Sequence, residues 1–271
     1  MPHADVPGGR LHYVRQGAGE PLLLIQGMSA NHLHWGDDFL GLLTDDFDVV
    51  AYDHRGIGHS DATGEPFTIA ELAGDAAALM DGLGWDSAHV MGISMGGMVA
   101  QELALDHPDR VRTLTLGCTY CGGEGSSLTD GAVIQRLGEL MLGGHTEEAM
   151  RYGFEVNVSP EYAQDPAGYE LVQRIAAELP AGLEVLLLQV QAIAGHDTSG
   201  RLSGLSVPTL VVHGELDQML PADNGRMIAG LVPDARLEVF DGVGHAFWWE
   251  RPERTAELLR EHAATAAAPQ A

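Results

Sequence analysis

Two kinds of hydrophobic pattern take turns along this chain. Short, mostly apolar runs recur, and most are followed by a stretch in which apolar residues return every three or four positions. The first pattern predicts buried strands and the second predicts amphipathic helices. Strands are expected at 21–25, 47–52, 88–93, 111–116, 209–213 and 236–240, and the alternating polarity of 10–15 suggests an edge hairpin strand. Strands that alternate with helices indicate a mostly parallel sheet flanked by helices, an α/β fold.

Helical spacing is clearest at 33–43, 95–105 and 253–262. Thr68 followed by Glu71 is typical of a capping box, so a helix is expected from there to about Leu83. The alternation then stops, and four helices are expected at 130–142, 146–156, 160–178 and 183–193. We therefore predict an α/β core of residues 1–121 and 206–271 with a helical cap inserted at 122–205. The alanine-rich tail, 263–271, is expected to fray.

Composition narrows the class of protein. The 271 residues, 45% of them hydrophobic, can bury the core of one large domain. The apolar runs are too short to span a membrane, and the amino terminus lacks the apolar core of a signal peptide, so a cytoplasmic location is expected. With 14 arginines, no lysine and 39 acidic residues, the net charge of −25 disfavours nucleic acid and anionic lipid as partners. A small-molecule substrate is expected, and the oligomeric state stays open.

The two cysteines, Cys118 and Cys121, are spaced as C-x-x-C. Cys118 closes a predicted strand rather than opening a helix that would lower its pKa, and no further zinc ligands are spaced nearby. A structural role is therefore favoured over a redox pair. His32 and His34 are two residues apart, without the glutamate of a metalloprotease motif. Neither a metal nor an organic cofactor is expected.

The segment from Gly92 to Gly96 joins a predicted strand to a predicted helix, with Ser94 between them. A serine at such a joint must turn sharply, and side chains at the two glycines would collide with the crossing backbone. The free N–H groups of the following helix point toward whatever the serine attacks. This G-x-S-x-G pattern is typical of a nucleophile elbow, which makes Ser94 the candidate nucleophile.

A serine nucleophile needs a base, and the base needs an acid that orients it. Asp217 follows the strand at 209–213, and His245 lies in a glycine-rich loop after the last strand. The order Ser94, Asp217, His245 is the one expected on this kind of sheet. Glu215 is an alternative acid. His54, His59 and His213 are more typical of structural histidines.

An oxyanion hole requires two donors. The backbone N–H of Met95 follows the nucleophile directly, and the N–H of Met28 lies in the loop after the strand at 21–25, where Gly27 permits a close approach. Substrate contacts are expected from Gly27 and from the rim aromatic residues Trp35, Phe247 and Trp248. Apolar helix residues that could form a pocket ceiling are Met141, Phe154 and Leu187.

Taken together, these motifs resemble the α/β-hydrolase superfamily over residues 10 to 262. The carriers are Gln26-Gly27-Met28, the glycine-punctuated loop from Asp53 to Ser60, the elbow, Gly214 to Asp217, and Gly244-His245. Within it, the sequence is similar to small esterases, enol-lactone hydrolases and cofactor-free haloperoxidases. Gln26 departs from the histidine common in the family.

The resemblance implies a serine hydrolase that cleaves a carboxylic ester or lactone of a small, largely apolar substrate through an acyl-enzyme, without a cofactor. A serine at the elbow speaks against haloalkane dehalogenases and epoxide hydrolases, which use a carboxylate there. Three alternatives stay open: a perhydrolase, a carbon–carbon bond hydrolase, and a non-enzymatic small-molecule receptor on the same fold.

Overall fold

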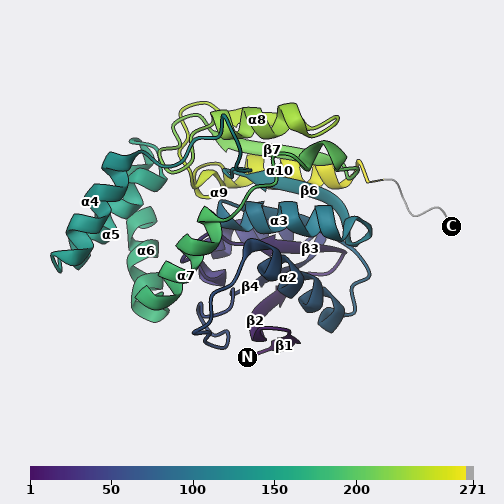
Figure 1. Ribbon diagram of the computed structural model, residues 1–271, viewed down its shortest axis with the longest axis horizontal. Helices are drawn as coiled ribbons and strands as arrows, with labels where there is room; N and C mark the ends of the chain where they lie inside the picture. Colours follow the sequence, from purple (N-terminus) through teal and green to yellow (C-terminus); the bar gives the residue numbers. More distant parts are fainter. Residues whose placement is uncertain (267–271) are drawn as a thin grey trace.

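One eight-stranded sheet organises the molecule. The computed structural model describes residues 1–266, and the strand order is β1-β2-β4-β3-β5-β6-β7-β8 (Figure 1). The strands are β1 (His3–Val6), β2 (Gly9–Gln16), β3 (Glu20–Ile25), β4 (Phe47–Tyr52), β5 (Ala88–Ile93), β6 (Val111–Gly117), β7 (Thr209–Gly214) and β8 (Arg236–Phe240). The pairs β1–β2 and β2–β4 are antiparallel and all other pairs are parallel, which confirms the expected fold class. Residues 267–271 of the predicted tail lie outside the described residues.

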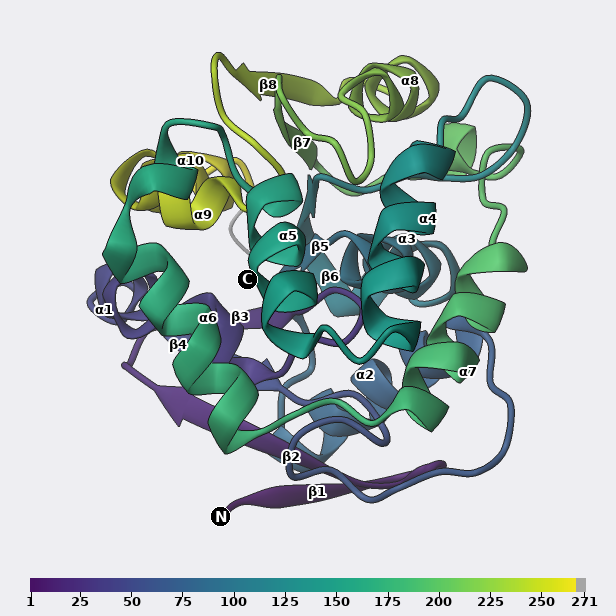
Figure 2. The same cartoon turned by 90° about the vertical axis from the view of Figure 1, so that its left-hand side faces the viewer.

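Helices cover both faces of the sheet (Figures 1 and 2). On one face lie α2 (Ile69–Leu83), α3 (Met95–Asp106) and α8 (Asp223–Leu231), and on the other lie α1 (Asp37–Leu43), α9 (Phe247–Glu250) and α10 (Pro252–Ala263). Alternate residues of the strands point to opposite faces of the sheet, and each face has its own hydrophobic core. Leu23 and Ile25 of β3 pack with α2 and α3, whereas Leu22 and Leu24 pack with α1 and α10. A strand buried on both faces needs apolar residues at every position, as the sequence of β3 has.

Four helices follow β6 and precede β7: α4 (Gly131–Leu142), α5 (Thr146–Asn157), α6 (Pro166–Glu178) and α7 (Leu183–Ala194). They stand beyond one end of the sheet, at the left of Figure 1 and in front of the sheet in Figure 2. No helix within residues 1–266 is long and apolar enough to cross a membrane.

Several predicted elements differ from those observed. The helix expected at 33–43 is split into a 3-10 turn, His32–Trp35, and α1, because Gly36 between them has a φ of 77°. The helix expected at 160–178 begins only at Pro166. The Asp165 side chain caps its start, and Pro166 occupies the first turn, where a missing N–H costs no hydrogen bond. Residues 10–15, expected as an edge strand, belong to β2, which pairs on both sides.

The capping box of α2 yields a stability prediction. The hydroxyl oxygen of Thr68 accepts a hydrogen bond from Glu71 N, and the Glu71 carboxylate accepts one from Thr68 N. Thr68→Ala is therefore expected to lower the free energy of unfolding by about 1 kcal/mol in urea denaturation, since the helix start loses its cap. Thr63→Ala, at a half-buried threonine in the loop before the helix that caps no helix, is the control. Equal effects of the two substitutions would contradict the role assigned to the cap.

Candidate active site

The joint between β5 and α3 holds Ser94 in a strained backbone conformation. Its φ of 53° and ψ of −123° are unusual for a residue with a side chain. The packing around Ser94 leaves no room for a side chain at either flanking glycine. A Cβ on Gly92 would lie 2.2 Å from the carbonyl oxygen of Gly96, and a Cβ on Gly96 would lie 2.2 Å from the carbonyl oxygen of Ile25. The expected sharp turn is present, and both positions must be glycine because a larger residue would collide with the neighbouring backbone.

The neighbouring strand β6 fixes the serine backbone from the other side. Ser94 N donates to the carbonyl oxygen of Gly117 at 2.9 Å, and the Thr119 hydroxyl donates to the carbonyl oxygen of Ser94 at 2.6 Å. The elbow is thus held between the carboxyl ends of β3 and β6, at the edge of a parallel sheet where ligands usually bind.

Asp217 and His245 meet at this edge. The Nδ1–H of His245 donates to Asp217 Oδ2 at 2.7 Å, and both side chains are buried. Asp217 Oδ1 accepts two further hydrogen bonds, from Met219 N and Leu220 N, each at 2.8 Å. The alternative acid, Glu215, accepts a bond from Gly242 N instead. Asp217 is therefore the carboxylate that orients the imidazole.

The charges of this pair shift both pKa values. Burial works to raise the pKa of Asp217, but the charge of His245 and the hydrogen bonds from His213 and His245 outweigh it and lower this pKa to about 2. Burial works to lower the pKa of His245, but the negative charge of Asp217 outweighs it and raises this pKa above its ordinary value. Asp217 is thus ionised at neutral pH.

Two residues beside the pair were assigned only structural roles from the sequence. His213, fully buried on β7, donates through Nε2 to the carbonyl oxygen of Leu220 at 2.8 Å and lies 3.3 Å from Asp217 Oδ2. The Cys118 thiol, also fully buried, lies with a nitrogen of His245 and an oxygen of Asp217 within a span of 4.8 Å. Burial raises the pKa of the Cys118 thiol, which keeps it neutral. In the sequence, only the position of His213 and Cys118 beside the end of a predicted strand indicated that they could lie near the active site.

The loop after β3 approaches the elbow closely. A Cβ on Gly27 would lie 3.0 Å from that of Ser94, so this glycine permits the contact. The N–H groups of Met28 and Met95 have no hydrogen-bond acceptor within the described residues. Gln26, which replaces the family's histidine, accepts a bond from Gly27 N through its own side chain at 3.0 Å.

These elements surround a pocket of about 310 Å³ that contains both Ser94 and His245. No hydrogen bond joins these two side chains among residues 1–266, and such bonds are often long before substrate binds. Apart from the loop after β3 and the elbow, the side chains that line this pocket are largely apolar. They include Met150, Phe154, Val172, Met219, Trp248 and Trp249.

Four predicted pocket residues lie elsewhere. Trp35 and Phe247 are completely buried and pack in the core beside Trp248. Trp35 ends the 3-10 turn before α1 and Phe247 begins α9, and both side chains join the core on that face of the sheet rather than the pocket wall. Met141 and Leu187 are 52% and 60% exposed, on the outer faces of α4 and α7. Gly27, Trp248 and Phe154 line the pocket as expected.

The inserted helices hold residues 26–31, the loop after β3 that carries the predicted oxyanion donor Met28 and is called the oxyanion loop below. Ser29 N, one residue beyond Met28, donates to the side-chain oxygen of Gln189 on α7 at 2.8 Å. The Asn31 side chain donates to the carbonyl oxygen of Leu179, between α6 and α7. The position of the Met28 N–H therefore depends on α7.

The same insertion also holds the histidine loop. Ala246 N donates to the carbonyl oxygen of Asn157, the last residue of α5, at 2.7 Å. The buried Glu250 carboxylate accepts bonds from Gly244 N at 2.8 Å and from Ser159 N at 3.0 Å, which ties the two segments together. Sequence reasoning missed both Glu250 and Gln189, since neither belongs to a recognisable motif.

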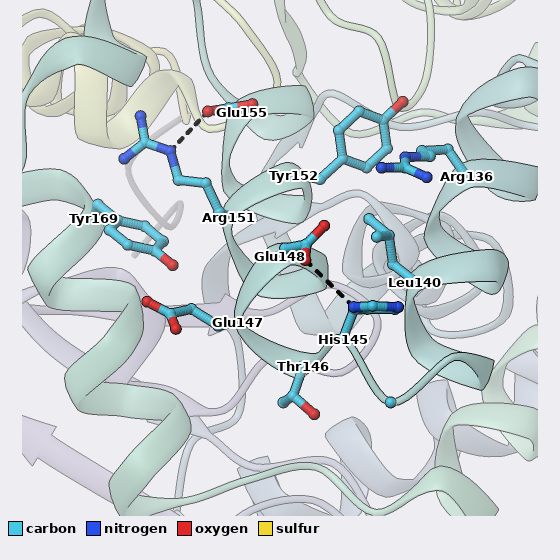
Figure 3. Close-up of a pocket in the computed structure, with 11 residues that line it drawn as sticks. Arg136, Leu140, His145, Thr146, Glu147, Glu148, Arg151, Tyr152, Glu155 and Tyr169 are labelled. Atoms are coloured by element: carbon cyan, nitrogen blue, oxygen red, sulfur yellow. Dashed lines mark hydrogen bonds and ion pairs between the residues drawn. The ribbon is translucent and has the colours of Figure 1, made fainter.

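A second hollow, of about 720 Å³, lies between α4, α5 and α6 (Figure 3). Charged and polar side chains dominate it, and Arg151 pairs with Glu155 while His145 pairs with Glu148. Arg151 also stacks over Tyr169, 4.7 Å from the ring centre. This hollow contains none of the predicted catalytic residues, so the smaller pocket at the elbow is the candidate active site.

Comparison with known proteins agrees with this architecture. A family model described as the alpha/beta hydrolase fold matches residues 20–252. The chain belongs to this family. Membership confirms the expected superfamily and makes the protein a hydrolase of the α/β fold.

Relatives of known or assigned activity extend over nearly the whole chain. A putative carbamate hydrolase, RutD, of Azorhizobium caulinodans is 31% identical, covering 96% of this chain and 97% of its own. The solved structure of Est816, an N-acyl homoserine lactone degrading enzyme, is 29% identical with a TM-score of 0.79, covering 96% of this chain and 99% of its own. The enol-lactonase of Burkholderia xenovorans LB400 is 25% identical with a TM-score of 0.84, covering 97% and 100%. The expectation of an ester-bond hydrolase agrees with these relatives.

The contact between Gln189 and Ser29 generates a prediction. Gln189→Leu removes the acceptor of Ser29 N and also the buried, unpartnered Nε2 of Gln189, so the free energy of unfolding should change by less than about 1 kcal/mol. The loosened loop should lower kcat by about tenfold to a hundredfold on a p-nitrophenyl ester, with a smaller change in KM.

The matched control is Gln191→Leu, an exposed glutamine on the same helix, which should leave kcat unchanged. An unaltered kcat in Gln189→Leu would contradict the dependence of the oxyanion loop on α7.

Proposed function

We propose that this protein is a serine hydrolase that cleaves carboxylic esters or lactones through an acyl-enzyme. Ser94 is the nucleophile, His245 the base, Asp217 the acid, and the N–H groups of Met28 and Met95 form the oxyanion hole. The observation that carries the proposal is the 2.7 Å bond between His245 Nδ1 and Asp217, in the same pocket as a strained serine.

The mechanism follows from which nitrogen of His245 is already hydrogen-bonded to Asp217. Asp217 engages Nδ1 of His245, so Nε2 is the nitrogen that takes the proton of Ser94 as the hydroxyl attacks the carbonyl carbon. The carbonyl oxygen becomes negative and accepts hydrogen bonds from the two unpaired N–H groups. His245 then protonates the leaving alcohol, and the acyl-enzyme forms. In the second half, His245 removes a proton from water, which attacks the acyl carbon and frees Ser94.

The pocket favours small, largely apolar substrates. Its volume is about 310 Å³, and thioether, aromatic and aliphatic side chains form most of its wall. We propose that residues 122–205, with α4 to α7, act as a cap over this pocket, because Met150 and Phe154 of α5 and Val172 of α6 line it. The lactones named for Est816 and the enol-lactonase are of the class that such a pocket would take.

The nucleophile is tested by labelling and by turnover. A fluorophosphonate should add one adduct to the native protein by intact mass, and none to Ser94→Ala. The same substitution should lower kcat on p-nitrophenyl esters by about 10⁴ to 10⁶-fold, since no other group replaces the hydroxyl.

Ser29→Ala is the matched control, because Ser29 lines the same pocket; it should keep the adduct. A Ser94→Ala variant that loses less than tenfold in kcat would rule Ser94 out as the nucleophile.

The raised pKa of His245 generates a pH prediction. The base must be neutral to accept a proton, so kcat/KM should fall as the pH decreases through this pKa, with the midpoint above about 6.5, the ordinary value for histidine. Asp217→Asn removes the negative charge and should lower kcat by about 10⁴-fold and move the midpoint to lower pH.

Glu215→Gln, which changes the neighbouring carboxylate, is the control and should leave the profile in place. Should Glu215→Gln rather than Asp217→Asn move the midpoint, Glu215 would be the acid.

A substrate panel separates the remaining alternatives. Esters of increasing acyl length, a lactone and a carbamate report on the bond cleaved, and peroxide with bromide reports on perhydrolase chemistry. We expect short-chain esters or lactones to be turned over fastest by water. Faster halogenation than hydrolysis would indicate a perhydrolase, and ligand binding without labelling or turnover would indicate a receptor.

A further inference from the structure

Four histidines, none of which lines the candidate pocket, gather where the amino-terminal hairpin meets the loop after β4. His12 lies on β2, His32 in the 3-10 turn before α1, and His59 in the loop from Asp53 to Ser60. His12 and His32 are buried, at 2% and 8% exposure, and His59 is half-buried. His3 of β1 contacts the outer side of His12, with ring centres 5.3 Å apart. The proposed catalytic mechanism uses none of these rings.

A buried carboxylate completes the group. Asp53 has 0% exposure, and it accepts bonds from His32 N at 2.7 Å, from His32 Nδ1 at 2.9 Å and from His59 N at 3.0 Å. His12, His32 and Asp53 can each offer one ligand atom, and these three atoms lie within 4.8 Å of one another. Three such groups from separate elements are an arrangement that can share one ion.

We propose that His12, His32 and Asp53 bind a late transition-metal ion of the Zn²⁺ class, with His59 as the fourth ligand. With Zn–N bonds of about 2.0–2.1 Å, two imidazoles on one tetrahedral ion have ring centres about 5 Å apart. The rings of His12 and His32 are 4.9 Å apart, and those of His12 and His59 are 5.1 Å apart. The separation of His32 from His59, 6.2 Å, closes when the half-buried His59 side chain rotates.

The chemistry of the ligands selects the ion. Imidazole nitrogens favour zinc, nickel, cobalt and copper, whereas Mg²⁺ and Ca²⁺ prefer all-oxygen sites. Metal-bound histidines usually donate their other N–H to a carbonyl or carboxylate, which fixes the ring. His12 already does this, because its Nδ1–H donates to the carbonyl oxygen of Pro2 at 3.0 Å and leaves Nε2 with a free lone pair.

A bound ion would cross-link three segments of the chain: β2, the turn before α1, and the loop after β4 that carries both Asp53 and His59. The site is therefore structural, and its ligands are separate from the residues that we assign to hydrolysis. Binding should stabilise the folded state because the unfolded chain does not bring the ligands together.

The test is a titration of the full-length, tag-free protein with Co²⁺ and Zn²⁺ in excess Mg²⁺, which suppresses weak binding to the acidic surface. We expect one equivalent of Co²⁺ to give the visible absorption of a tetrahedral site and Zn²⁺ to displace it. His12→Gln and His32→Gln should each raise the Kd at least tenfold and abolish the increase in Tm caused by Zn²⁺.

His145→Gln, which removes an exposed histidine of the insertion, is the matched control and should bind as the native protein does. His245→Ala should also bind normally. This control matters because Cys118, Asp217 and His245 form a second group of possible ligands. Loss of binding in His245→Ala with retention in His12→Gln would overturn the proposal, as would a native protein that binds no Co²⁺ in excess Mg²⁺.

A measurement on the native protein keeps the test independent of variant folding. Anomalous diffraction at the zinc edge, from crystals soaked in Zn²⁺, should place an ion among His12, His32 and Asp53. An ion found only elsewhere, or none, would contradict the assignment.

Discussion

The close crossing of the elbow over the end of β3 is the constraint on which the rest of the site depends. A non-glycine residue with positive φ costs about 1–3 kcal/mol and persists only where its surroundings fix it. Here the surroundings are the backbone of Ile25 against Gly96 and the bonds from Ser94 to Gly117 and Thr119. Because three strand ends meet at this crossing, the same contacts that strain the serine also bring Gly27 against it.

The inserted helices line the candidate pocket and also hold two of the loops that surround it. Gln189 of α7 accepts a bond from the loop that carries Met28, and Asn157, at the end of α5, accepts one from the loop that carries His245. A displacement of the helices would therefore move the oxyanion loop and the histidine loop together. Sequence differences in such an insertion can alter turnover as well as substrate preference, because the loops with the proposed donor at Met28 and the proposed base at His245 are hydrogen-bonded to it.

Sequence pattern predicted β4, β5 and β8 residue for residue. β4 and β5 are buried along almost their whole length, so most of their positions are apolar. The pattern failed for β1, whose four residues are too few to show a period, and for α8, which is short and polar. It also failed at the pocket wall, because sequence places Trp35 and Phe247 near the sheet edge but does not show that both side chains pack against Trp248 in the core. The triad and the cytoplasmic location stay predictions.

The histidine group shows a kind of contact that local sequence spacing does not reveal. His32 and His34 are two residues apart in the sequence, yet the contacts of His32 are with Asp53 and His12, which lie on other segments of the chain. Asp53 joins this group to the candidate active site. Its carboxylate accepts bonds from the backbone N–H and the ring of His32. His32 begins the 3-10 turn that directly follows the loop after β3. Anything that stiffens this corner therefore also restrains the far end of the oxyanion loop.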